Sequence, residues 1–326
     1  MIGGVMETGG LTVKSIASAL DINLIYARRL FQLSQKNSTL DDIRKIVEDK
    51  PKPFVKWVGG KRQLLKQFRE LNLYPPECFN PESNTYFEPF VGGGAVFFDL
   101  LPKHAELSDT NRELVITYNV IKDNVDGLIK SLKKHIYNKE YYLRVRAQDI
   151  NELSDIEIAS RFIFLNRTGF NGMYRVNKSG QFNVPFGRYK NPLICDENNL
   201  RKVSEALQGI TITHRDYKDV LELAKIGDFI YFDPPYYPLN PTSSFTAYTA
   251  KGFFEKEQIE LRDTFVKLHE RGCFVMLSNS DTPFINELYS ELEGVSINKI
   301  IAGRAINSKG SKRGKINEVL ITNYQA

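Results

Sequence analysis

The chain contains 326 residues, which is enough for a large core domain with a smaller unit beside it. Lys and Arg number 44 against 39 Asp and Glu, and the net charge of +5 permits a nucleic-acid partner without requiring one. A hydrophobic fraction of 42%, with no apolar stretch long enough to cross a bilayer, excludes a membrane-spanning protein and a wholly disordered one.

The first fifty residues have the pattern of a small helical unit. Residues 13–20, a turn at Asp21 and residues 24–30 follow one another as helix, tight turn and helix, which is the layout of a helix-turn-helix. A helical unit that only packs on its neighbour is an equally good interpretation, because Asp21 replaces the glycine that many such turns carry. Pro51 and Pro53 end any helix here, so we place a boundary after residue 50.

Two further features bear on compartment and metal content. Residues 1–10 lack the basic segment followed by an apolar one that forms a secretory signal, so we expect a cytoplasmic protein. Cys78, Cys195 and Cys273 include no CxxC pair, which argues against disulfides and a structural zinc site. The four histidines form no spaced ligand set, and we expect no metal.

Beyond residue 53, short β-like runs alternate with amphipathic helices, which is typical of an α/β sheet protein. A first strand at residues 86–91 runs into three glycines and a helix at 95–101. A second strand at 228–232 ends at an Asp-Pro-Pro-Tyr sequence. The pattern therefore predicts two strands that each end in a motif able to contact a ligand.

The C-terminal part supplies the remaining predicted elements. A helix at 255–271 precedes a third strand at 273–277. Residues 295–301 and 317–322 can pair as a terminal hairpin around the basic segment 304–315. That basic segment is expected either to flank a DNA backbone or to be a solvated loop.

The stretch between the first two strands has a different character. Its predicted helices are rich in Lys, Arg and Tyr and enclose a loop at residues 166–192. An insertion between two strands that end in motifs usually carries substrate specificity. We therefore divide the chain into a helical extension at 1–50, a catalytic domain at 51–122 and 208–326, and a target-recognition domain at 123–207.

Three glycines, at residues 92–94, follow the first strand. Glycine has no Cβ, so the backbone can approach a ligand closely and turn sharply into a helix. The spacing departs from the G-x-G-x-x-G of dinucleotide sites and from the lysine-bearing phosphate loop, so neither an NAD site nor a nucleotide triphosphatase is supported. A crowded structural turn remains an alternative interpretation.

The sequence Asp233-Pro234-Pro235-Tyr236 is more specific. Two prolines fix φ and offer no backbone donor, so the carboxylate and the carbonyls form a rigid rim of acceptors beside an aromatic ring. Such a rim suits a flat molecule with an amino group, whose hydrogens would point at Asp233 and at the Pro234 carbonyl while Tyr236 stacks on the ring. A strand-terminating turn with an incidental tyrosine is the structural alternative.

Five segments occur in an order that is specific to one family. They are residues 54–61 (FVKWVGGK), 88–94 (EPFVGGG), 166–172 (NRTGFNG), 182–190 (FNVPFGRYK) and 233–236 (DPPY). From residue 53 to residue 324 the chain resembles the S-adenosylmethionine-dependent DNA adenine methyltransferases of the Dam and DpnII type. The resemblance implies an α/β fold, with a Rossmann-like methyltransferase sheet, an inserted mainly helical target-recognition domain and a small helical N-terminal extension.

The resemblance also implies a cofactor site. It would hold S-adenosylmethionine and release S-adenosylhomocysteine, with contacts from Trp57, Lys61, Gly92, Gly94, Asp109 and Asp233. Asp109 matches the acidic residue that holds the ribose hydroxyls, and a carboxylate can accept two such hydrogen bonds. An N-cap of the following helix is the structural alternative for Asp109, and the two roles are compatible.

The chemistry follows from the reacting groups. The adenine amino nitrogen is a poor nucleophile because its lone pair is delocalised, whereas the methyl group of a sulfonium is already activated. Orientation and local polarisation should therefore dominate catalysis. Acceptance of both amino hydrogens by Asp233 and the Pro234 carbonyl would direct the lone pair at the methyl group, so we assign catalysis to Asp233, Pro234, Pro235 and Tyr236.

An adenine within a duplex cannot reach such a site, so the double-stranded DNA partner must present it flipped out. The resemblance places Arg175 at a guanine and Lys56 at a further base, with apolar contacts from Met173 and Pro185. Asn171, in the segment NRTGFNG, is assigned to the DNA site as well, and Arg188 and Lys190 are expected at phosphates. A solvated surface side chain is the alternative for each basic residue, above all for Lys178. Together these residues predict methylation of adenine within GATC.

Other classes remain open at this point. One alternative is a DNA-binding regulator with a decayed methyltransferase fold, and another is an enzyme acting on cytosine N4 or on RNA. Cytosine N4 enzymes favour serine where Asp233 stands, which favours adenine. The contacts of residues 278–281, the role of the N-terminal helices and the presence of a cognate restriction endonuclease are undetermined, and a monomer is the simplest expectation.

Overall fold

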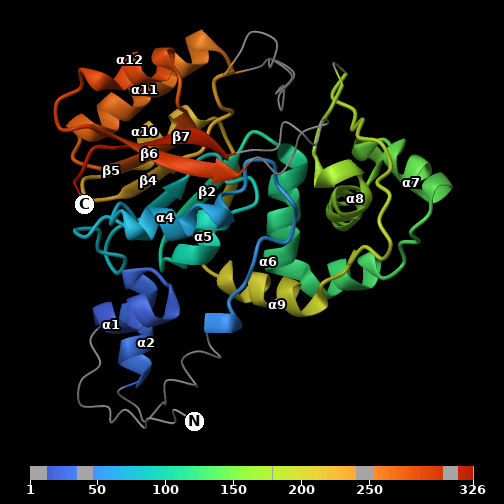
Figure 1. The fold of residues 1–326 in the computed structure, drawn as a ribbon. Helices are drawn as coiled ribbons and strands as arrows, with labels where there is room; N and C mark the ends of the chain where they lie inside the picture. Colours follow the sequence, from blue (N-terminus) through green and yellow to red (C-terminus); the bar gives the residue numbers. More distant parts are fainter. Residues whose placement is uncertain (1–12, 35–46, 178, 240–252, 304–314, 326) are drawn as a thin grey trace.

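The structure is a computed structural model, and it describes residues 13–34, 47–177, 179–239, 253–303 and 315–325 (Figure 1). Within these ranges seven strands form one sheet in the order β3-β2-β1-β4-β5-β7-β6. Strands β1 to β5 are parallel, and β7 runs antiparallel to both β5 and β6. The strands are β1 Tyr86–Glu88, β2 Ala105–Asp109, β3 Thr211–His214, β4 Phe229–Phe232, β5 Phe274–Ser280, β6 Ser296–Gly303 and β7 Lys315–Thr322.

Helices cover both faces of the sheet, because its strands are apolar on both sides. Along β4, Phe229 and Tyr231 face one apolar cluster, whereas Ile230 and Phe232 face the other. The first cluster is completed by α4 Leu65–Glu70, α5 Ala95–Leu100, α6 Arg112–Leu132, α8 Asp155–Thr168 and α9 Glu197–Ala206. The second is completed by α10 Val220–Leu223, α11 Glu255–Glu270 and α12 Pro283–Ser290. The predicted α/β fold is confirmed.

The strands near the motifs differ slightly from the predicted bounds. β1 ends at Glu88 rather than at residue 91, since Pro89 has no N–H for the ladder. β5 continues three residues past the predicted end, to Ser280, because β7 pairs with it there. The terminal hairpin forms as predicted from β6 and β7. Residues 304–314 of the basic segment lie outside the described ranges.

The inserted region shares the core of the sheet domain. Helix α6 passes through the predicted boundary between residues 122 and 123 and is kinked at Asn124 (φ −150°, ψ 55°). Phe162 and Ile163 of α8 and Val203 of α9 belong to the first apolar cluster. Helix α7, Lys139–Arg146, instead joins α8 around a separate small core that includes Tyr142, Phe164, Phe182 and Val184. The division into domains stays a prediction, with this small core as its structural support.

Part of the predicted recognition loop is helical. The loop was expected at residues 166–192, but α8 continues to Thr168, so Asn166 and Arg167 lie in its last turn. Arg167 donates through Nη2 to the backbone oxygen of Phe54 at 2.7 Å, so its guanidinium makes a contact within the protein. Asn166 is 1% exposed. The loop therefore begins at Gly169, and Lys178 lies outside the described residues.

The N-terminal helices dock on the sheet domain, on the side away from α7 and α8 (Figure 1). Helices α1 Val13–Leu20 and α2 Leu24–Ser34 enclose their own apolar cluster. Asp21 adopts the left-handed conformation (φ 49°) in which such turns commonly use glycine, which explains the departure in sequence. Asn23 donates to the backbone oxygen of Asp99 at 2.6 Å, and Arg69 bridges Asp21 and Asp99. The predicted helix, turn and helix are present, and polar contacts fix them to α4 and α5.

Candidate functional site

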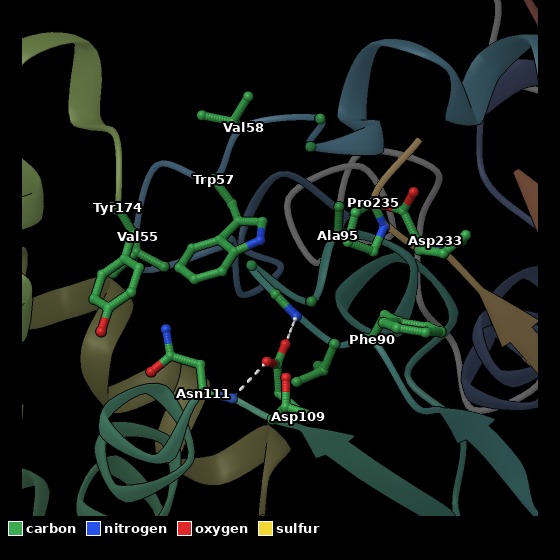
Figure 2. Close-up of a pocket in the computed structure, with 18 of the residues that line it drawn as sticks. Val55, Trp57, Val58, Phe90, Ala95, Asp109, Asn111, Tyr174, Asp233 and Pro235 are labelled. Carbon is green, nitrogen blue, oxygen red and sulfur yellow. Dashed lines mark hydrogen bonds between the residues drawn. The ribbon is translucent and has the colours of Figure 1, made fainter. Parts of the chain in front are cut away.

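A cavity of about 1290 Å³ lies at the carboxyl ends of β1, β2 and β4. The chain runs outwards from β1 through β2 to β3 and then crosses back to β4 on the other side of β1, so the strand order reverses between β1 and β4. Such a switch point opens a crevice that neighbouring loops line, and ligands of α/β sheets bind there. Trp57 and Tyr174 lie on one side of the cavity, Asp233 and Pro235 lie on the other, and Asp109 lies below and between them (Figure 2).

The glycine loop is shaped around two aromatic side chains. Gly92 and Gly94 have φ values of 45° and 67°, which favour glycine. A Cβ on Gly92 would lie 2.5 Å from the indole nitrogen of Trp57, and one on Gly94 would lie 2.6 Å from the Tyr118 hydroxyl. The crowded-turn interpretation is therefore correct as far as it goes. The crowding also brings the Trp57 indole directly against the loop that lines the cavity.

Asp109 ends β2 and holds the turn beyond it. Its carboxylate accepts hydrogen bonds from the backbone N–H groups of Gly92 at 3.1 Å and Asn111 at 2.9 Å (Figure 2). Burial raises the pKa of Asp109 to about 6, although these hydrogen bonds oppose the rise. The N-cap interpretation of Asp109 is wrong, because Asn111 is the N-cap of α6 and accepts from Leu114 N.

Lys61 and Asp233 form an ion pair inside the cavity. The two atoms Lys61 Nζ and Asp233 Oδ1 lie 2.7 Å apart, with the lysine side chain 4% exposed and the aspartate 21%. Lys61 comes from the 3-10 helix η2 Lys61–Gln63, and its ammonium also lies 4.9 Å from the ring centre of Tyr236. Burial raises the pKa of the Asp233 carboxyl, and the ammonium of Lys61 opposes that rise. The ion pair therefore favours ionised Asp233.

A buried amide pair fixes the backbone that follows Asp233. Gln258 on α11 donates to the carbonyl of Pro235 at 3.0 Å and accepts from Asn279 Nδ2 at 2.9 Å. Asn279 Oδ1 accepts from the backbone of Tyr237 at 3.1 Å, and Ser280 donates to the Tyr237 carbonyl at 2.7 Å. Among residues 278–281, whose contacts were open from the sequence, Asn279 and Ser280 thus hold Tyr237, directly after the Asp-Pro-Pro-Tyr segment, and Asn279 reaches Pro235 through Gln258. Ser278 instead contacts Tyr231, and Asp281 contacts Asn286 and Lys299.

The tyrosine of that segment is oriented from the opposite strand. The hydroxyl of Tyr236 donates to Glu318 Oε2 on β7 at 3.0 Å. Burial, together with nearby Asp233 and Glu318, raises the pKa of Tyr236 well above its ordinary value. Tyr236 thus lies in the cavity as a neutral phenol beside Lys61.

Glu88 is a buried carboxyl at the end of β1 that sequence reasoning did not assign. It accepts from the Tyr86 hydroxyl at 2.8 Å and from Phe97 N at 3.1 Å. Burial raises its pKa to about 8, and the negative charge of Asp233 acts in the same direction. Glu88 is therefore protonated at neutral pH and ties β1 to α5 across the glycine loop.

The side of the cavity opposite Asp233 is a stack of rings. Trp57 stacks on Tyr174 with ring centres 6.0 Å apart and an interplanar angle of 22°, and on Phe162 at 6.4 Å and 29°. The Tyr174 hydroxyl donates to Glu113 at 2.9 Å, and Glu113 pairs with buried Arg161 at 2.7 Å. A flat aromatic surface beside Asp109 suits a heterocycle joined to a ribose.

The predicted site residues divide into two groups. Those that line the cavity are Lys56, Trp57, Lys61, Gly92, Gly94, Asp109, Asn171, Asp233, Pro234, Pro235 and Tyr236. Five predicted DNA contacts are not among the residues that line it: Met173, Arg175, Pro185, Arg188 and Lys190. Of these five, Met173 is half-buried and the other four are exposed. The predicted catalytic and cofactor residues thus share one cavity, and most predicted DNA residues lie on the loop beside it.

Hydrogen bonds within the protein hold the recognition loop and orient Arg175. Phe170 N donates to Pro185 O at 2.9 Å, and Gly187 N donates to Thr168 O at 2.8 Å. Asn183 accepts from Arg175 Nε at 2.7 Å through its side chain and from Nη2 at 3.4 Å through its backbone oxygen, whereas Nη1 makes no hydrogen bond among the described contacts. The loop is therefore a pre-formed surface with an oriented guanidinium.

Several residues that shape the site were not assigned a role from the sequence: Glu88, Glu113, Asn166, Gln258, Asn279 and Glu318. Apart from Glu88, whose partners Tyr86 and Phe97 are close in the chain, each acts mainly through a partner far away in the chain, so no local spacing marks it. The available signals were that Glu88 and Asn166 begin two of the five family segments and that Asn279 lies in the Ser-Asn-Ser-Asp sequence at residues 278–281. Within the described ranges no group of three or more His, Cys, Asp or Glu residues is arranged to hold a metal, and no helix is long and apolar enough to span a membrane.

Comparisons with known proteins show which proteins this chain is similar to. The model of the D12 class N6 adenine-specific DNA methyltransferases matches residues 57–306. The type II methyltransferase M1.LlaDCHI of Lactococcus lactis subsp. cremoris is 47% identical over 281 residues, covering 84% of this chain and 95% of that protein. M.MjaIII, a type II methyltransferase of Methanocaldococcus jannaschii, is 46% identical over 291 residues (84% and 99%). The DNA adenine methylase of Escherichia coli K12 is 34% identical over 275 residues (83% and 95%).

Proposed function

The chain belongs to the D12 class of N6 adenine-specific DNA methyltransferases, and from this premise we propose that it methylates a flipped-out adenine within GATC, with S-adenosylmethionine as donor. The observation that carries the proposal is the shared cavity, in which Asp233 and its acceptor rim face the Trp57 stack and Asp109. Membership of the family decides against the cytosine N4 and RNA alternatives. GATC specificity rests on the loop residues.

The residues present fit the donor. The ring of Trp57 offers a flat face for the adenine of the cofactor, and Asp109 retains lone pairs for the ribose hydroxyls after accepting two backbone hydrogens. Gly92 and Gly94 line the cavity, and a Cβ on either would clash with Trp57 or Tyr118 and displace the loop. Lys61 supplies a cation for the carboxylate of the methionine part. When bound, the cofactor supplies a sulfonium methyl group that is already activated for transfer.

Asp233 is proposed to act on the adenine amino group. Its Oδ1 pairs with Lys61, and this ion pair favours the ionised carboxylate against burial, which raises the pKa of Asp233. The carboxylate and the Pro234 carbonyl accept the two amino hydrogens, so the nitrogen lone pair points to the methyl group. As the N–C bond forms, one N–H proton becomes acidic and leaves through Asp233. Tyr236 packs against the flipped ring, and Glu318 fixes its hydroxyl.

Gln258 and Asn279 together form a clamp on the backbone of residues 235–237, and this clamp supports the proposed geometry. Gln258 engages the carbonyl of Pro235, and the two prolines fix φ on either side of the preceding peptide, which carries the Pro234 carbonyl. The direction of the neighbouring Pro234 carbonyl is thereby set before substrate arrives. Catalysis by orientation requires such a pre-formed arrangement, since small displacements of acceptors are costly in rate.

The exposed loop residues are proposed to read the DNA. Arg175, held through Nε by Asn183, can present its remaining donors to O6 and N7 of a guanine. Met173 and Pro185 supply neighbouring apolar contacts, and Arg188 and Lys190 neutralise phosphates. Lys56 and Asn171 lie where the loop meets the cavity, which suits contacts next to the flipped base. The double-stranded substrate is taken by one molecule acting on each strand in turn.

The setting of the enzyme is part of the proposal. The relatives include two named as type II methyltransferases and one named as a DNA adenine methylase. A cognate restriction endonuclease is therefore a reasonable partner, and action as a cytoplasmic monomer is the simplest arrangement.

A direct test uses plasmid from a methylation-deficient host that expresses the protein. The plasmid should resist a nuclease that cuts only unmethylated GATC and should be cut by a nuclease that requires methylated GATC. Plasmid from the same host expressing the Asp233→Ala variant serves as the control and should show the reverse pattern of cleavage. Unchanged cleavage by both nucleases in the wild type would refute GATC specificity.

A further inference from the structure

One buried side chain joins the segment of the cofactor site to the recognition loop. Asn166, in the last turn of α8, accepts from Lys56 N at 2.8 Å and donates to Lys56 O at 2.8 Å. The same amide nitrogen donates to Gly172 O at 3.0 Å. The Asn166 side chain thus joins the backbone of Lys56 to the backbone of Gly172 through three hydrogen bonds. Lys56 belongs to the segment proposed to contact the cofactor, and Gly172 belongs to the loop proposed to contact DNA.

The two segments are also in direct contact. Gly172 has a φ of 62°, and a Cβ there would lie 2.5 Å from Lys56 Cδ. One residue after Lys56, Trp57 stacks on Tyr174, which stands directly before Arg175. Tyr174 is anchored in turn through Glu113 to Arg161. Residues assigned to DNA, Lys56 and Arg175, therefore adjoin in sequence the two rings that face the cofactor site.

This arrangement gives the two ligands a common framework. A cofactor packed on Trp57 restrains the segment 54–61, and DNA held by Arg175 restrains the loop that Asn166 ties to that segment. The second ligand then meets residues that the first has already ordered, which favours its binding. We propose that Asn166 and Tyr174 are positioning residues that couple cofactor binding to recognition of the target DNA. This inference rests on the proposed function.

The chain offers a matched control for Asn166. Asn199 on α9 makes the same pair of hydrogen bonds with the backbone of Lys52, accepting from Lys52 N and donating to Lys52 O, both at 2.9 Å. Lys52 lies four residues before Lys56 on the same segment. Among the described contacts, Asn199 makes none with the recognition loop, so it separates loss of an amide–backbone pair from loss of the link.

The test is the affinity of S-adenosylhomocysteine, measured by calorimetry on the full-length protein with and without a saturating duplex that contains one GATC. The wild type should bind the compound at least about fivefold more tightly with the duplex, and this ratio should fall to within about twofold of one in Asn166→Ala. Asn199→Ala should keep the wild-type ratio. Tyr174→Leu should lose it and Tyr174→Phe, which keeps the ring, should retain it.

Thermal unfolding identifies variants that fail to fold. If Asn166→Ala fails to fold, the comparison of Tyr174→Leu with Tyr174→Phe tests the coupling instead. A wild-type ratio of one, or a wild-type ratio preserved in Asn166→Ala and Tyr174→Leu, overturns the coupling. A wild type that binds no S-adenosylhomocysteine, or binds GATC no better than a scrambled duplex, overturns the proposed function instead.

Discussion

Lys61 Nζ lies 2.7 Å from Asp233 Oδ1, so a residue of the cofactor motif and the first residue of the catalytic motif form one ion pair. The two motifs stand far apart in the chain, yet each depends on the other electrostatically. Burial raises the pKa of Asp233, and Lys61 is the charge that opposes this effect. Catalysis by an ionised Asp233 therefore requires Lys61 even before the cofactor arrives.

Lys61→Met removes the charge while keeping much of the side-chain volume. The pKa of Asp233 should rise, and the acidic limb of the pH profile of kcat should move up by roughly 1–3 pH units. Activity should recover towards higher pH, because Asp233 ionises there. The measurement is kcat against pH at saturating cofactor, with Lys61→Arg as the charge-preserving control. An acidic limb at the same pH in Lys61→Met and the wild type would contradict this role.

Asn279→Ala removes the hydrogen bonds that Asn279 makes to Tyr237 N and to Gln258, which hold the backbone after Asp233. Asn279 itself is not among the residues proposed to contact the cofactor or the DNA. We expect kcat to fall roughly 10- to 100-fold through misplaced acceptors, with the KM for cofactor little changed. The buried partners left behind should lower the free energy of unfolding by about 1–3 kcal/mol. Asn286→Ala is the control, because Asn286 donates to Asp281 and Thr282 nearby and makes no described contact with residues 233–237. Equal kcat values in the two variants would argue against the clamp.

Arg175→Ala should relax discrimination at one base pair of the site. Loss of a bidentate guanine contact costs about 1–3 kcal/mol of preference, equivalent to roughly 5- to 150-fold in the ratio of kcat/KM for GATC over a singly substituted site. Arg188→Ala should instead weaken binding to all sequences alike and reduce its salt dependence. Equal weakening on every sequence in Arg175→Ala would reassign Arg175 to a phosphate.

Glu88 predicts a pH dependence of stability. Its pKa is about 8 in the folded protein and about 4.5 when exposed, so the folded state binds the extra proton between these values. Stability should therefore fall as pH rises from 4.5 to 8 and level off above 8, by at most about 1.4 kcal/mol per pH unit. Glu88→Gln removes this loss, so its Tm advantage over the wild type should grow across that window. A constant Tm difference would show that Glu88 is ionised throughout.

The sequence was sufficient for the strand that carries Asp233, because Asp233 follows the apolar strand β4 and parallel strands place such residues at one edge of a sheet. Asp109 was assigned through the family resemblance alone, since β2 (AELSD) has no apolar run that would predict a strand. The exact end of β1 was missed because Pro89 was read as part of the strand. The recognition loop was also predicted to begin too early, at Asn166. Asn166 and Arg167 instead belong to the end of helix α8, which packing on α6 stabilises.

The network behind the motifs was beyond sequence reasoning for a physical reason. The partners Asn166 and Lys56 are 110 residues apart, and Tyr236 and Glu318 are 82 apart, so neither contact has a local period. The N-cap alternative for Asp109, which the structure contradicts, illustrates a subtler limit. Asp109 and Asn111 are both good capping residues, and only the backbone conformation shows that Asn111 is the cap.

The central claim is that this cavity methylates adenine N6 within GATC through Asp233. The most direct measurement is mass spectrometry of the nucleosides from duplexes incubated with the purified protein and S-adenosylmethionine. The account predicts N6-methyladenine in a duplex with a single GATC, little in a duplex with that site scrambled, and at least about 100-fold slower formation by Asp233→Ala. Methylcytosine as the product, equal methylation of the scrambled duplex, or an Asp233→Ala rate within a few-fold of the wild type would contradict it.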